Sequence, residues 1–365
     1  MNCNHESRTL SGDVVRLGHI DQMKAIAILF MVEVHTAAIL PPEGIGVGHP
    51  AAFVAAAFGG MAAPLFVTVS GWGMHRGAKK RFADGLASRA WVDWVLPRVL
   101  VLTACQILVN ILLAAERGGR FEWHTPGVLT LLALAAIVAP LIARLRVENL
   151  IGLFAIFAIT PLLVGDLNGS DLSWFERVDA AGASEWFQRL LVNGTYPVLP
   201  WFALSTLGAI LAESEENQRL RLGIIQMGGF VLLASIILSV RNGTAWALTE
   251  GDAVLTFFPA SVFFVFITTM FVFIAHEVLL LNAQRGFINL SFIEASGRLT
   301  LTIYVLHFAV LGLAASYMMG QPRLAVIPAF TITFAHTLAW IPLANLHQKH
   351  CPNFSLEALL RRLSN

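Results

Sequence analysis

Residues 19–40 read HIDQMKAIAILFMVEVHTAAIL, and this stretch decides the class of fold. From position 22 it is mostly apolar over about the 20 residues that an α-helix needs to cross the hydrocarbon core of a bilayer. It also holds Asp21, Lys24, Glu33 and His35. Ionisable side chains are costly in lipid, so each one needs a partner or a function. The stretch therefore predicts a membrane-spanning helix that carries part of a functional site.

Around this helix the chain has the composition of a membrane protein. Of its 365 residues, 56% are hydrophobic and 13% are charged, and the mean hydropathy is +0.70. Soluble domains average about 25% charged residues, so this chain has too little polar side chain to cover a surface that faces water. The predicted fold class is all-α, a polytopic membrane helix bundle of about ten transmembrane helices. We predict spans at 22–41, 51–73, 92–115, 126–143, 149–165, 196–212, 222–240, 253–275, 299–319 and 324–345.

Lysine and arginine predict how this bundle is oriented. Of the 24 basic residues, 18 fall on the side of the two termini and 6 on the other side, and an excess of positive charge marks the cytoplasmic side. Both termini are therefore predicted to be cytoplasmic, in a multi-pass protein of the plasma or inner membrane. The predicted organisation is a cytoplasmic N-terminal segment at 1–21, a transmembrane domain at 22–345 and a cytoplasmic C-terminal tail at 346–365. The outer loop at 166–195 is expected to hold an interfacial helix.

Several classes of function find no support in the sequence. A net charge of +1 gives no reason to expect nucleic acid as a partner, and three scattered cysteines form no disulfide framework. There is no HExxH or CxxC motif and no His/Asp cluster at ligand spacing, so no metal site is predicted. A GxSxG elbow and a glycine-rich nucleotide loop are also missing.

Two polar residues of the first span, Lys24 and His35, are predicted to lie on one face of the helix. Lys24 and His35 are eleven residues apart, which on a helix is three turns plus about 20° and about 16 Å along the axis. One face would thus carry a cation at the cytoplasmic mouth and an imidazole in the outer half of the membrane, with Asp21 able to pair with Lys24. Alternatively, the Lys24 side chain only extends its ammonium group to the membrane surface, and His35 only makes a hydrogen bond to a neighbouring helix. Glu33 lies about 200° from His35 and is expected to pair with a basic or His side chain of another span.

Other histidines lie at the bundle mouth or inside the later spans. His49 begins the second span on the outer side and is a candidate for proton transfer. Tyr304 and His307 share a helix face at a spacing of three. His336 is expected to make a hydrogen bond between helices.

The strongest basic cluster follows the second span, at 76–81. Together with Arg98 and Arg298 at the inner mouth, it could attract a phosphorylated cofactor. The orientation of the bundle by itself is the alternative explanation for this cluster.

Four segments, in chain order, resemble the signatures of a known superfamily. They are RLGHIDQMKAIAILFMVEVH at 16–35, AAPLFVTVSG at 62–71, PVLPWFALSTLG at 197–208 and GRLTLTIYVLH at 297–307. The superfamily is that of membrane-embedded acyltransferases, which includes heparan-alpha-glucosaminide N-acetyltransferase-like proteins and bacterial glycan O-acyltransferases. Lys24 stands where these proteins usually have Arg, and Ala25 where they usually have Gly.

The resemblance implies an enzyme that moves an acyl group, with acetyl expected, from cytoplasmic acetyl-CoA to a hydroxyl or amine of an extracytoplasmic sugar or glycan. The catalytic residue would be His35 in the O-acyltransferase branch and His49 in the heparan branch, and both stay open. The implied partners are acyl-CoA, the glycan acceptor and the lipid bilayer, with a homodimer as a possible assembly. Six residues are expected to bind the acyl-CoA: Lys24, Arg16, Arg98, Arg298, Tyr304 and His307.

A transporter or flippase of a small solute or lipid-linked sugar is the alternative from another class. Its proton relay would consist of Glu33, His35, His307 and His336. Stabilisation by CoA would identify the enzyme, and counterflow in liposomes would identify the carrier. A purely structural membrane subunit would leave the polar face of the first span unexplained.

Overall fold

The computed structural model describes residues 17–46, 49–83, 85, 88–319 and 323–364. In this part of the chain, eight helices or helical runs are long and apolar enough to cross a membrane. They are α1 (Gly18–Ile39), α2 (Pro50–Arg81), the run of α3 (Ser88–Ala90), η1 (Trp91–Val95) and α4 (Leu96–Leu112), the run of α6 (Val147–Ala158), α7 (Thr160–Val164) and η3 (Gly165–Asn168), α11 (Gln218–Asn242), α12 (Val262–Arg285), α14 (Thr300–Met318) and α15 (Val326–His350).

Two further apolar segments complete the match to the predicted spans. One is a helix pair bent by 49°, which joins α9 (Ala183–Gln188) and η4 (Arg189–Asn193) to α10 (Val198–Glu213); the other is α5 (Val128–Ile142), of 15 residues. Each of the ten predicted spans overlaps one of these helical segments, and the prediction of a helix bundle is confirmed. The remaining elements are η2 (Ala115–Arg117), α8 (Trp174–Val178), α13 (Ser291–Arg298), α16 (Leu356–Leu363), β1 (Ala245–Glu250) and β2 (Ala253–Phe258).

The predicted span at 253–275 is wrong in its first part. Its opening residues form β2, which pairs in parallel with β1, and α12 begins only at Val262. Pro259 accounts for the late start, because proline has no amide hydrogen and disfavours the helical conformation of the residue before it. Ser261 then caps the helix, accepting a hydrogen bond from the Phe264 amide at 3.2 Å.

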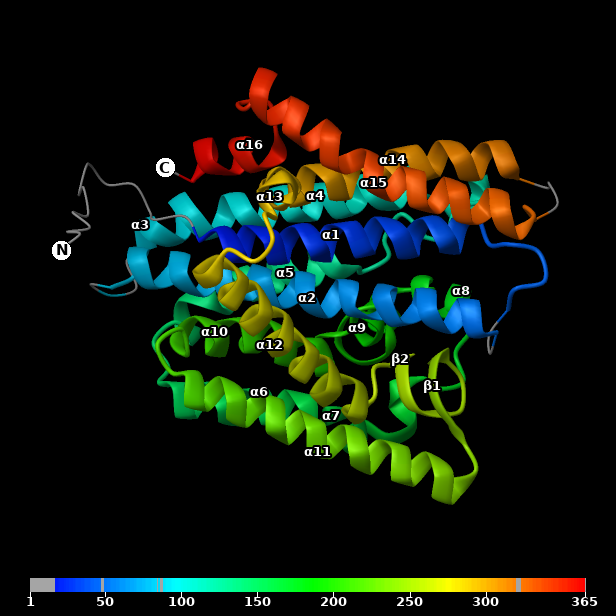
Figure 1. The fold of residues 1–365 in the computed structure, drawn as a ribbon, viewed down its shortest axis with the longest axis horizontal. Helices are drawn as coiled ribbons and strands as arrows, with labels where there is room; N and C mark the ends of the chain where they lie inside the picture. Colours follow the sequence, from blue (N-terminus) through cyan, green and yellow to red (C-terminus); the bar gives the residue numbers. More distant parts are fainter. Residues whose placement is uncertain (1–16, 47–48, 84, 86–87, 320–322, 365) are drawn as a thin grey trace.

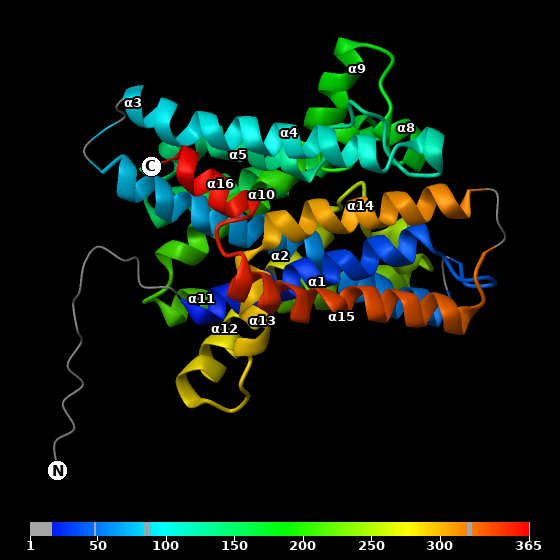
Figure 2. The ribbon, with the colours of Figure 1, turned by 90° about the horizontal axis from the view of Figure 1, so that it is seen from above.

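Helix α1 lies at the centre of the bundle. It packs against α2, α12, α13, α14 and α15 (Figures 1 and 2). The start of α1 lies at the same end of the bundle as α16 (left in Figure 1), and we call this the terminal end. The finish of α1 lies at the opposite end together with α8, β1 and β2, and we call this the cap end. Lys24 therefore belongs to the terminal half of α1 and His35 to the cap half.

Helices α2 and α10 make a close backbone contact at two glycines. A methyl group on Gly71 would collide with the backbone carbonyl oxygen of Ser205, and one on Gly208 would collide with that of Thr68. Small residues permit this close approach between helices in a membrane. The second-span signature and the mid-chain signature of the sequence thus meet along one seam.

The predicted C-terminal tail at 346–365 is ordered against the bundle as far as it is described. Helix α15 continues to His350, and α16 packs against α14 and α4. The Glu357 carboxylate accepts hydrogen bonds from the Leu301 and Thr302 amides at 2.7 and 3.1 Å. These amides belong to the first turn of α14, which has no intrahelical acceptors for them, so α16 satisfies the start of α14.

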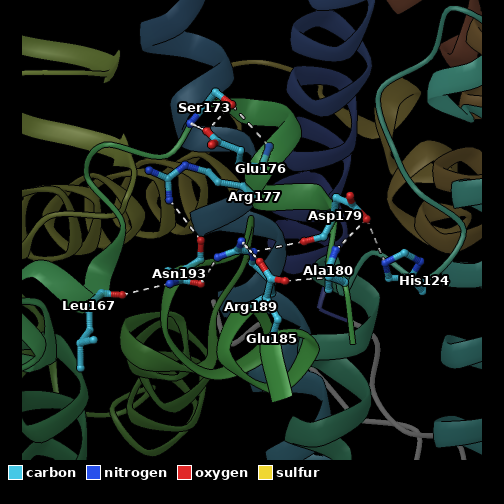
Figure 3. Close-up of polar contacts among 11 residues, drawn as sticks. His124, Leu167, Ser173, Glu176, Arg177, Asp179, Ala180, Glu185, Arg189 and Asn193 are labelled. Atoms are coloured by element: carbon cyan, nitrogen blue, oxygen red, sulfur yellow. Dashed lines mark hydrogen bonds and ion pairs between the residues drawn. The ribbon is translucent and has the colours of Figure 1, made fainter. Parts of the chain in front are cut away.

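The outer loop predicted at 166–195 contains short helices joined by a polar network (Figure 3). The buried Arg177 guanidinium donates to the carbonyl oxygens of Gly169 and Asn193. Arg189 donates to the Asn193 side chain at 2.9 Å and forms an ion pair with Glu185 at 2.5 Å. Both arginines therefore hold this part of the cap together.

Candidate active site

Two histidines from opposite ends of the chain meet inside the bundle. Nδ1 of His35 in α1 lies 2.9 Å from Nε2 of His307 in α14, and the two rings are nearly parallel. His307 is fully buried, and His35 is half-buried. Of the two, only His35 keeps accessible surface.

The hydrogen bonds of this pair determine which nitrogens carry protons. His307 Nδ1 lies 3.0 Å from the backbone carbonyl oxygen of Ile303, which can only accept, so Nδ1 must hold the hydrogen. In a neutral imidazole the other nitrogen is then an acceptor, and His35 Nδ1 must donate to it. His35 Nε2 is left with a free electron pair, which is the state that a general base or nucleophile requires.

Aromatic rings surround the histidine pair. The Phe308 ring lies 4.6 Å from the ring of His35 and 4.2 Å from that of His307, measured between centroids. Tyr304 contacts His307 at 5.6 Å and stacks on Phe66 of α2 at 5.8 Å. The predicted shared face of Tyr304 and His307 is thus present, with His307 bonded to His35 and Tyr304 about one turn nearer the start of α14.

A group of charges lies at the terminal end of α1. Lys24 Nζ is 3.4 Å from Asp21, which confirms the predicted pair, and Arg298 lies 3.3 Å from the same carboxylate. Arg298 also pairs with Glu294 at 2.8 Å. The Lys24 ammonium is 5.9 Å from the centre of the Trp72 ring. The structure thus brings two of the predicted acyl-CoA ligands, Lys24 and Arg298, to one place.

Acidic residues at the end of α10 and just after it meet the basic cluster of α2. Glu213 pairs with His75 at 2.6 Å and with Lys79 at 2.5 Å, and Glu215 pairs with Arg76 at 2.7 Å. These residues line a cleft of about 400 Å³. The sequence analysis missed both glutamates as partners, and they reduce the positive potential expected at 76–81.

The remaining predicted acyl-CoA ligands lie elsewhere. Arg98 donates to the Trp94 carbonyl at 2.8 Å and to the Ser364 hydroxyl at 3.0 Å, so it holds the chain after α16 and does not join Lys24. Arg16 lies outside the described residues.

The other predicted histidine and carboxylate residues make no hydrogen bond to His35 in the described chain. His49 is exposed at the start of α2, where its ring accepts a hydrogen bond from the Ala51 amide at 3.1 Å. His336 lies 2.8 Å from the Thr36 hydroxyl, and the predicted bond between helices is confirmed. One Glu33 oxygen is buried without a hydrogen-bond partner among the described residues. The predicted pairing of Glu33 with another span is therefore wrong for the part of the chain that the structure describes.

Candidate metal ligands do not cluster in the described ranges, where no group of three or more His, Cys, Asp or Glu side chains could hold a metal ion. The site consists instead of an imidazole pair near the cap end and paired charges at the terminal end, joined by α1.

Comparison with known proteins agrees with this arrangement. The acyltransferase domain model of the acyltransferase 3 family matches residues 17–344, which include α1 through most of α15. A search of curated proteins found no match. The helices that carry His35, His307, Lys24 and Arg298 all lie within the matched region. The chain therefore belongs to the acyltransferase 3 family of membrane acyltransferases.

Proposed function

We propose that the protein transfers an acetyl group from cytoplasmic acetyl-CoA to a hydroxyl or amine of a sugar or glycan on the other side of the plasma or inner membrane. The observation that carries this proposal is the hydrogen-bond chain from Ile303 through His307 to His35. It leaves His35 Nε2 unprotonated and ready to accept the proton of an incoming acceptor. The family of the chain supports acyl transfer as the reaction.

The donor enters at the terminal end in this proposal. Lys24 and Arg298 provide two cations there for the phosphates of CoA, although both also contact Asp21. The distance from Lys24 to His35 is about 16 Å along the helix, which is similar to the length of a pantetheine arm. The thioester would then reach the imidazole pair while the nucleotide stays at the terminal end.

Transfer proceeds with His35 as general base. Nε2 of His35 takes the proton from the acceptor hydroxyl or amine as its oxygen or nitrogen attacks the thioester carbonyl carbon. The tetrahedral intermediate then collapses, the carbon–sulfur bond breaks, and the imidazolium returns the proton to the CoA thiolate. An acyl-histidine formed on the same Nε2 is the alternative route. In both routes His307 acts through His35 and is a positioning residue.

Acetyl-CoA turnover by the purified protein tests the proposal. His35→Ala should lower turnover by about 10²- to 10⁴-fold, the usual contribution of a general base, whereas His49→Ala should stay near wild type. Loss of activity in His49→Ala with retention in His35→Ala would contradict the assignment. CoA should also raise the melting temperature, and solute counterflow without any effect of CoA would favour the carrier instead.

A further inference from the structure

Arg120 lies in the loop between α4 and α5, toward the cap end of the bundle, as His35 does. Its charge is close enough to His35 to act electrostatically on that ring. The two residues are also linked by packing, because Phe121 contacts Phe308 with ring centroids 6.0 Å apart, and Phe308 contacts His35. Arg120 is therefore the cap-end cation that this packing links to a molecule bound at His35.

The loop holds the Arg120 backbone in a fixed place. The amides of Arg120 and Phe121 both donate to the Leu113 carbonyl, at 2.9 and 3.1 Å. The Trp174 indole donates to the Arg120 carbonyl at 2.9 Å. The same indole ring lies under the guanidinium, 5.5 Å from ring centre to Cζ. The side chain is thus oriented by the loop and by an aromatic surface.

The donors of Arg120 are not used by the protein. Within the described part of the chain, its guanidinium makes no hydrogen bond and no ion pair. Arg177 and Arg189 differ in this respect, since they donate to backbone carbonyls and side chains of the cap. Arg120 is half-buried, and burial lowers its pKa while the Glu250 carboxylate opposes that effect. A half-buried cation whose N–H groups make no hydrogen bond or ion pair costs free energy, and a bound anion would recover part of it.

We infer that Arg120 binds an anionic group of the acceptor, a carboxylate or a phosphate, and so selects acidic sugars over neutral ones. The inference rests on the proposed function, because it places the acceptor at His35. The planar fork of five N–H donors suits both anions. The CoA phosphates are not expected to compete for it, since their proposed cations lie at the terminal end, where Lys24 is about 16 Å from His35 along α1.

Two matched pairs of probes test this inference: glucuronate with its methyl ester, and glucose 1-phosphate with glucose. The measured quantity is the ratio of kcat/KM between the charged and the neutral member of each pair. The wild type should prefer at least one charged member by about tenfold or more, as expected for charge-assisted hydrogen bonds. Arg120→Gln should bring that ratio to about one, and Arg120→Lys should retain part of it. Arg117→Gln, in an exposed position of the same loop, should keep the wild-type ratio.

The outcomes separate this inference from the proposed function. A wild-type enzyme without preference in either pair, or an unchanged ratio in Arg120→Gln, would overturn the role of Arg120 and leave acyl transfer intact. An equal loss of kcat with charged and neutral acceptors would also overturn it, since Arg120 would then act on the reacting atoms. Binding is measured separately, as thermal stabilisation by glucuronate or glucose 1-phosphate. If stabilisation is lost in Arg120→Gln while wild type turns over no acetyl-CoA, the anion site stands and the proposed function fails.

Discussion

His307→Phe is the perturbation that best tests how the histidine pair works. Phenylalanine keeps an aromatic ring of similar size beside Phe308, but it cannot accept the hydrogen bond from His35 Nδ1. His35 would then lose the partner that fixes its tautomer and supports its positive charge during proton transfer. We expect a lower kcat with an unchanged KM for acetyl-CoA, because the donor is bound mainly at the terminal end.

The magnitude follows from the change in charge on His35. In the transition state the 2.9 Å bond to His307 becomes a hydrogen bond from a cation, and such bonds contribute about 1.5–3 kcal/mol. This range corresponds to a loss of about 10- to 150-fold in kcat. The loss should be smaller than that of His35→Ala, which removes the base itself. His307→Gln, whose amide oxygen can occupy the place of Nε2 and accept the same bond, should recover part of the activity.

Acetyl-CoA turnover at saturating donor, with the thermal shift on adding CoA as a check on folding, measures these effects. The matched control is His336→Phe, since His336 bonds to the Thr36 hydroxyl and, in the described chain, makes no hydrogen bond to either histidine of the pair. A His307→Phe variant with wild-type kcat, or with a raised KM and unchanged kcat, would refute the positioning role. Failure of His307→Gln to exceed His307→Phe would refute the hydrogen bond as its cause.

Three further predictions concern the framework. Gly71→Ala should lower the free energy of unfolding by about 1–3 kcal/mol, because the new methyl group collides with the backbone of α10. Gly73→Ala is the control and should not lower it, because nothing lies within 4 Å of its new methyl group. Thermal unfolding in detergent measures both variants. Glu357→Ala should lower the free energy of unfolding by about 1–2 kcal/mol, because it removes the acceptor for the first amides of α14. Arg361→Ala, at an exposed position of α16, is its control. Equal melting temperatures for the two variants would contradict the capping role of Glu357. Hydrogen bonds from the N-cap serine of α8 hold the pKa of Glu176 below its usual 4.5. The capping box of α8 should therefore persist above pH 4.5 and weaken as the pH falls below that value. Amide hydrogen exchange in α8 measures this change, and protection of these amides that does not depend on pH would contradict the prediction.

The helices of this protein could be predicted because each span is a local property of the chain. An apolar run of sufficient length predicts a spanning helix wherever it occurs, and the span predicted at 324–345 overlaps α15. The same rule failed at 253–258, where an apolar sequence forms β2. Hydropathy does not distinguish an apolar strand from a helix, and Pro259 was the local signal that could have corrected it.

The partner of an individual site residue could be predicted only where the contact is local. The pair of Asp21 and Lys24 is three residues apart and follows from helix geometry. His35 and His307 are 272 positions apart, and no periodicity in a single sequence relates two such residues. Arg98 is a further example, because a basic residue near a span end resembles a phosphate ligand, and its hydrogen bond to Ser364, 266 positions away, does not follow from the sequence.

The seam between α2 and α10 also bears on how the bundle could move. Each backbone enters the space that a glycine of the other helix leaves free, at Gly71 and Gly208, so neither helix can slide along the other without a collision. An alternating-access carrier works by moving one group of helices against another around a central site. Such tight packing between two helices is instead expected in a protein whose helices keep one arrangement while its two substrates arrive from opposite sides.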